Sequence, residues 1–87
     1  MVKIWIKLIK EDKIKKDIVV EKDEPFDYAS FADYLTEGLF PLDEPTPVVL
    51  KNHIFDFAKF NVARFRPSDF VESVDFDYMW VENLDRD

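Results

Sequence analysis

The chain has 87 residues, with 19 acidic and 12 basic side chains and a formal net charge of −7 at pH 7. Hydrophobic residues make up 47 % of it and aromatic residues 16 %, which excludes a disordered chain. The absence of cysteine excludes disulfide scaffolds, thiolate metal sites and cysteine nucleophiles. We therefore expect one folded domain over residues 1–87 that needs no cofactor, in which residues 84–87 form a frayed tail.

Charge is unevenly distributed along the chain. Residues 1–22 hold seven lysines against four acids, whereas residues 23–50 hold seven acids and no base. A net negative domain is repelled by phosphate backbones, so direct nucleic-acid binding is not expected. No apolar run approaches the roughly 20 residues of a membrane span, and lysines interrupt the apolar N-terminal stretch, so we expect a cytoplasmic protein without a membrane segment.

Apolar residues alternate with polar ones over residues 2–21, which predicts a β-hairpin. The polar turn at residues 11–13 separates its two strands. The buried face of the first strand is expected to carry Val2, Ile4, Ile6 and Leu8.

The spacing of apolar residues then changes to a helical one and predicts the main helix over residues 26–37. Gly38, the one glycine of the chain, is expected to end this helix in a left-handed conformation. The apolar positions at i, i+3, i+4, i+7 and i+11 are Tyr28, Phe31, Ala32, Leu35 and Leu39.

Three prolines between residues 39 and 47 indicate a stiff connection. Residues 51–60 fit either a strand or a short helix capped by Asn52, and we favour the helix. An extended segment, a turn and a C-terminal strand follow, and Val74, Phe76, Tyr78 and Trp80 are expected to face the helix. The prediction is a two-layer α+β domain in which the hairpin and the C-terminal strand form a sheet with the main helix and the short second helix packed on it.

The second side of this sheet would then be uncovered. Its apolar side chains would lie within a rim of lysines and aspartates, a composition typical of a surface that binds a protein partner or a second copy of the chain. Lysine stems or the short helix could instead cover the same residues. The predicted partner face consists of Trp5, Ile9, Val19, Met79 and Val81.

A second candidate site is a cluster of acids at Asp69, Glu72, Asp75 and Asp77. Carboxylates can hold Ca²⁺ or Mg²⁺ or act as acid and base, but the spacing lacks the glycine of a calcium loop. The alternative is that the first two acids cap a helical turn and the last two form cross-strand ion pairs with Arg64 and Arg66.

Chemistry based on the single histidine, His53, is disfavoured. It would need Ser30, Ser68 or Ser73 as the nucleophile, and no G-x-S-x-G motif is present. We therefore predict neither a catalytic nor a metal site.

Several short segments stand out along the chain: Lys3-Ile4-Trp5, Lys16-Asp17, Pro47-Val48-Val49-Leu50, Arg64-Phe65 and the run from Phe70 to Tyr78. In these segments the chain resembles a family of small uncharacterised bacterial proteins. The resemblance implies a bacterial cytoplasmic setting and carries over no activity.

These observations favour a non-catalytic protein-interaction or accessory module that can form a homodimer. One alternative is a metal-binding or carboxylate-based enzyme site on the acidic cluster. Another is an acidic mimic of nucleic acid, built on residues 23–50, that inhibits a DNA-binding protein.

Overall fold

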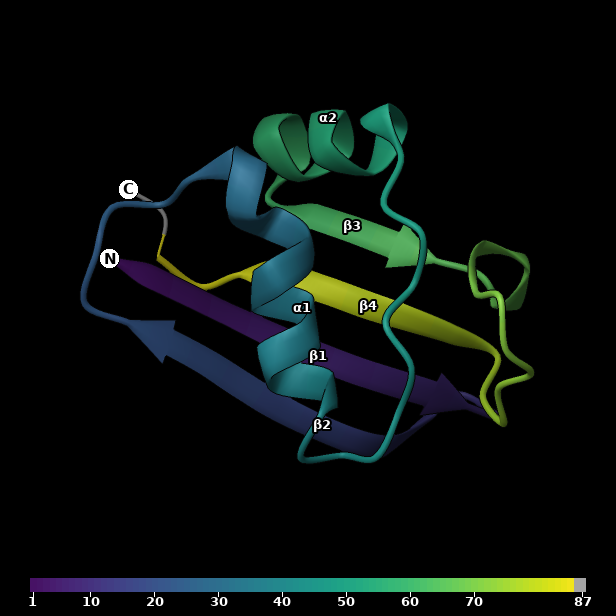
Figure 1. The fold of residues 1–87 in the computed structure, drawn as a ribbon. Coiled ribbons are helices and arrows are strands. Elements are labelled where there is room, and N and C mark those ends of the chain that lie inside the picture. Colours follow the sequence, from purple (N-terminus) through teal and green to yellow (C-terminus); the bar gives the residue numbers. More distant parts are fainter. Residues whose placement is uncertain (86–87) are drawn as a thin grey trace.

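A computed structural model describes residues 1–85 and contains one antiparallel sheet with the strand order β2-β1-β4-β3. Helix α1 crosses one face of this sheet, and α2 lies on the same side, next to β3 (Figure 1). This arrangement confirms the predicted two-layer α+β class with helices packed on a sheet. The elements are β1 (Val2–Lys10), β2 (Lys13–Lys22), α1 (Phe31–Leu39), α2 (Lys51–Phe60), β3 (Val62–Phe65) and β4 (Tyr78–Asn83).

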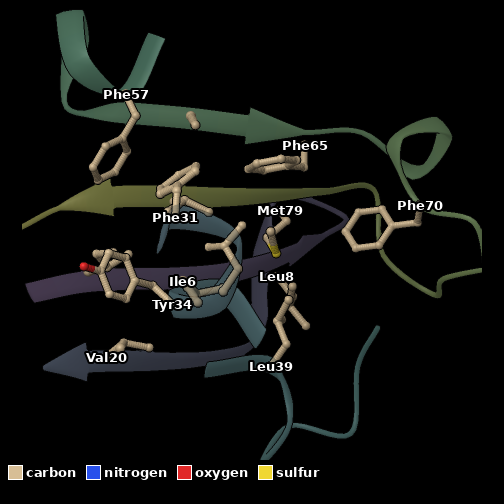
Figure 2. Packing of buried hydrophobic residues seen from close by; sticks show 14 of the residues in the cluster. Ile6, Leu8, Val20, Phe31, Tyr34, Leu39, Phe57, Phe65, Phe70 and Met79 are labelled. Carbon is tan, nitrogen blue, oxygen red and sulfur yellow. The ribbon is translucent and has the colours of Figure 1, made fainter. Parts of the chain in front are cut away.

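Strand β1 supplies the centre of the core. It pairs with β2 on one side and β4 on the other, and its even-numbered residues Val2, Ile4, Ile6 and Leu8 are fully buried. Helix residues Phe31, Tyr34 and Leu39 pack over them, together with Phe57 of α2 (Figure 2). The predicted hairpin is confirmed, and its turn places Glu11 and Asp12 at positive φ without a glycine.

The main helix begins later than the pattern predicted. Residues Tyr28–Ser30 form a 3₁₀ turn, and the Asp27 carboxylate caps that turn by accepting a hydrogen bond from the Ala29 N–H at 3.0 Å. Phe26 precedes the turn and stacks on Phe57, with ring centroids 5.5 Å apart. The segment at residues 26–30 therefore packs against α2 and α1 starts at Phe31.

Gly38 does not end the helix in a left-handed conformation, as predicted, but lies inside α1 with an ordinary helical φ. Its role is steric. A Cβ at this position would lie 2.6 Å from Cδ1 of Ile6 and 2.8 Å from Cγ2 of Val20. The glycine lets the helix backbone approach the sheet closely, and α1 continues one residue beyond it to Leu39.

The predicted second helix is confirmed as α2, but Asn52 lies within its first turn and does not cap it. The N-cap is Leu50, whose backbone N–H donates to Nδ1 of His53 at 2.9 Å. Asn61, with a φ of 62°, ends the helix and turns the chain into β3.

The C-terminal strand has the opposite facing from the one expected. Residues 74–77 are irregular and β4 begins at Tyr78, so the alternation that starts at Val74 does not continue through the strand. Met79 and Val81 are fully buried in the core, whereas Tyr78 and Trp80 lie on the other side. The expected inward facing of Tyr78 and Trp80 is therefore wrong.

The start and the end of the described chain lie close together. The Leu84 N–H donates to the Lys3 carbonyl at 2.8 Å, and the Met1 amino group lies 3.4 Å from Asp85. Residues 86–87 of the predicted tail lie outside the described residues. Within residues 1–85, no helix has both the length and the apolar character that crossing a membrane requires.

Replacement of Gly38 by alanine should destabilise the protein. Alanine favours a helix by about 1 kcal/mol, but overpacking a core costs about 1–3 kcal/mol, and the branched Val20 side chain has little freedom to move. We expect a lower urea midpoint of unfolding for Gly38→Ala, and a midpoint closer to that of the wild type when Val20→Ala is added. The control Asp33→Ala, on the exposed side of α1, should change the midpoint little. A higher midpoint for Gly38→Ala would contradict the close approach.

Candidate binding surface

The side of the sheet opposite the two helices, here called the outer face, is covered by no other element of the described chain (Figure 1). Strand register fixes its neighbours: Trp5 lies across from Val19 and Glu82, and Lys7 lies across from Asp17 and Trp80. The outer face consists of Lys3, Trp5, Lys7, Ile9, Asp17, Val19, Glu21, Val62, Arg64, Tyr78, Trp80 and Glu82.

Two tryptophans form the centre of the outer face and are held by charged neighbours. The indole N–H of Trp5 donates to Asp17 at 2.9 Å, and that of Trp80 donates to Glu82 at 3.1 Å. The Lys7 ammonium lies 4.0 Å from the Trp5 ring centroid and 5.7 Å from that of Trp80. These contacts fix both indoles in place, so the aromatic surface is preorganised.

The predicted partner face is correct only in part. Trp5 and Val19 lie on the outer face, and the Val19 side chain is 45 % exposed. Ile9 belongs to the same side but is 9 % exposed between its register partners Ile14 and Tyr78. The placement of Met79 and Val81 on this face is wrong, because both fill the core. The predicted face lacks three apolar residues of the outer face: Val62, Tyr78 and Trp80. An indole N–H that needs a polar partner is a signal for an outward position.

The four acids of the predicted cluster do not converge. Asp75 pairs with Lys10 and Lys15, and Asp77 accepts the Glu11 N–H at 2.8 Å. Asp69 accepts the Arg66 N–H at 2.8 Å, so it closes its own 3₁₀ turn and does not form a cap with Glu72. Within residues 1–85, no three acidic or histidine side chains are grouped as metal ligands.

The expected ion pairs of Asp75 and Asp77 with Arg64 and Arg66 are also not formed. The irregular residues 74–77 lie beside the hairpin turn. Asp75 is therefore close to the hairpin lysines Lys10 and Lys15, which donate hydrogen bonds to it in place of the arginines. Hydrogen bonds from Lys10 and then Lys15 lower the pKa of Asp75 to about 2, and the same contact raises the pKa of Lys10. The ion pairs of Asp75 therefore hold residues 74–77 against the hairpin.

A second surface feature, the β3–α2 groove, runs between strand β3 and helix α2. It consists of two adjoining hollows of about 380 Å³ and 490 Å³ that share Asp56 and Arg64. The larger hollow is otherwise lined by Phe60, Val62 and Trp80. The smaller, polar hollow is lined in addition by Asn52, His53, Arg66, Ser68 and Asp69.

His53 forms one wall of the polar hollow and is 3 % exposed. Its ring stacks on Phe65 with centroids 4.1 Å apart, and its Nδ1 accepts the Leu50 N–H. Its Nε2 lies 3.4 Å from Asp69. Because both ring nitrogens face partners other than Ser68, this histidine is placed to hold the start of α2 against the turn after β3, not to activate a serine.

The chain was compared with protein-family models, curated proteins and solved structures. No family model, no curated protein and no solved structure matches the chain.

The lowered pKa of Asp75 is testable by a carboxyl NMR titration of the folded protein. We expect a midpoint of about 2 in place of 3.8, and a return toward 3.8 in a Lys10→Ala, Lys15→Ala double variant. Because the folded pKa lies below the unfolded one, the stabilisation is present above about pH 3.8 and is lost as the pH falls through 2. Lys13→Ala, in the same hairpin, should leave the midpoint unchanged; an unchanged midpoint in the double variant would contradict the assignment.

Proposed function

We propose that this protein is a non-catalytic interaction module whose outer face binds a second copy of the chain. The observation that carries the proposal is the pair of fixed tryptophans at the centre of a sheet face that no described element covers. Preorganised aromatic side chains surrounded by charged residues are typical of the centre of a protein interface.

The size of the outer face suits such an interface. The strands have nine, ten, six and four residues, and at about 3.3 Å per residue and about 4.8 Å between strands they give a flat area of roughly 460 Å² before side chains are counted. A standard interface buries about 800 Å² on each partner. The outer face is therefore of the right order for a dimer in which two sheets stack.

The charges of the outer face favour a second copy as its partner. Lys3 pairs with Glu21, and Lys7 pairs with Glu82, so both signs alternate over the same surface. A surface that carries both signs can place each beside the opposite one in a two-fold related copy. The net charge of −7 on each chain opposes association at long range, so dimerisation should strengthen as salt is raised.

The acidic mimic of nucleic acid has less support. In the base-free block, Glu24 and Glu37 pair with Lys22, and Glu44 pairs with Lys16, so lysines of β2 neutralise part of it. A carboxylate-based or metal site has no grouped acids to use in residues 1–85. We include in the proposal of an interaction module the bacterial cytoplasmic setting that the family resemblance implies.

Light scattering over a range of protein concentrations tests the proposed dimer. We expect the molar mass to rise from 10.4 kDa toward twice that value. Val19→Lys should keep the protein monomeric, because it places a charge at an exposed position across from Trp5. Trp5→Asp should do the same at the centre of the face.

The matched control is Val71→Lys, which changes a more exposed valine in a loop away from the sheet and should leave the molar mass unchanged. Circular dichroism establishes that each variant is folded. A wild-type protein that stays at 10.4 kDa at the highest concentration, or a Val19→Lys variant that dimerises like wild type, would refute the proposal.

A further inference from the structure

Strand β3 is one edge of the sheet, and its backbone has unused hydrogen-bonding groups. The Asn83 N–H donates to the Asn61 carbonyl at 2.8 Å, which makes residues 61 and 83 a hydrogen-bonded pair in the β3–β4 register. Such pairs alternate in an antiparallel ladder, so Ala63 and Phe65 bond to β4. The N–H and C=O of Arg64 therefore point away from the sheet.

Arg66 is the next residue of the chain whose N–H points away from the sheet, and this N–H has a partner. The outward N–H of Arg66 is taken by the Asp69 carboxylate at 2.8 Å, which ends the strand. Within the described chain, no hydrogen bond reaches the outward groups of Arg64. One free donor and one free acceptor therefore lie at the middle of the β3–α2 groove.

Helix α2 supplies the opposite wall of this groove. Asn52, Asp56 and Phe60 are spaced four residues apart, so they lie on one side of the helix. The larger hollow has the apolar side chains Phe60 and Val62 beside the Trp80 ring. The polar hollow lies next to it along β3, at Arg66.

The two arginines of the groove have no acidic partner among the described residues. Arg64 and Arg66 make no ion pair within residues 1–85, although the chain has 19 acids and six of its lysines are paired. Arg64 instead lies 5.2 Å from the Tyr78 ring centroid. Of the two acids in the groove, Asp69 is occupied by the Arg66 N–H and lies beside His53, and Asp56 lies where the two hollows meet.

We propose that the β3–α2 groove binds an extended acidic peptide segment of another protein as an added strand. The backbone of the peptide bonds to the free N–H and C=O of Arg64. One apolar side chain of the peptide enters the hollow at Phe60, and a carboxylate two positions away reaches the guanidinium groups of Arg64 and Arg66. A separation of two positions matches the two hollows, because alternate residues of a strand point the same way.

This site goes beyond the proposed dimer and does not depend on it. The two surfaces meet at Trp80, but the dimer is tested at Trp5 and Val19 of β1 and β2, whereas the groove is tested at Arg66, next to the β3 edge on the other side of the sheet. The two proposals can therefore fail separately. Val19→Lys should abolish the dimer and keep peptide binding, whereas Arg66→Ala, outside the outer face, should weaken peptide binding about tenfold and keep the dimer.

Isothermal titration with a capped seven-residue peptide tests the groove. The peptide carries threonine at every position except one phenylalanine and, two positions away, one glutamate; a second peptide carries the two in reverse order. We expect one of the two orders to bind, and the order shows the direction of the added strand. Arg64→Ala or Arg66→Ala should weaken binding about tenfold, as loss of a hydrogen bond to a charged group does.

Three controls separate strand addition from nonspecific attraction of charge. Lys13→Ala removes a hairpin lysine that, among the described residues 1–85, also has no ion pair, and binding should not change. A peptide with N-methyl groups on its backbone should not bind. Hydrogen exchange of the Arg64 amide should slow on peptide binding, whereas that of Ala63, already bonded to β4, should not change.

Three results would overturn the proposal. The first is that neither peptide binds at millimolar concentration. The second is that the N-methylated peptide binds as tightly as the unmodified one, and the third is that Lys13→Ala weakens binding as much as Arg64→Ala does.

Discussion

The burial of the even-numbered side chains of β1 is the constraint on which the rest of the structure depends. Val2, Ile4, Ile6 and Leu8 have no exposed surface, and β1 lies inside the sheet, between β2 and β4. Helix α1 must therefore lie on that side, and it comes close enough to Ile6 that Gly38 can have no side chain. Met79 and Val81 face the same side because their strand pairs with β1.

Both candidate surfaces follow from placing the helices on one side. The odd-numbered residues of β1 remain uncovered, so Trp5 and Lys7 must find partners on the sheet itself, and Asp17 and Glu82 provide them. Helix α2 packs His53 and Phe57 inward beside the short β3 edge, and its other side then forms a groove with Arg64. The same packing therefore produces a flat aromatic face and a polar groove that meet at Trp80.

Much of the fold could be predicted because periodicity is strong where one face is buried. The hairpin and both helices follow from it. The facing of β4 could not be predicted from periodicity, because all four residues from Tyr78 to Val81 are large hydrophobic residues and the irregular residues before the strand shift the alternation. The indole N–H of Trp80 is the local signal for its outward position. Gly38 was misassigned because a glycine that permits close packing and one that ends a helix look alike in a sequence. The groove depends on the tertiary contact between α2 and β3, which periodicity does not indicate.

The pairing of β1 with β4 also determines the order in which the fold can be completed. Lys7 and Glu82, which are in contact, are 75 positions apart. At about 5–20 residues per second, a ribosome needs several seconds to synthesise the intervening chain, during which the hairpin can form but one edge of β1 stays open. An open apolar strand edge invites pairing with other chains. The nascent protein is therefore most exposed to aggregation between completion of the hairpin and arrival of residues 78–83.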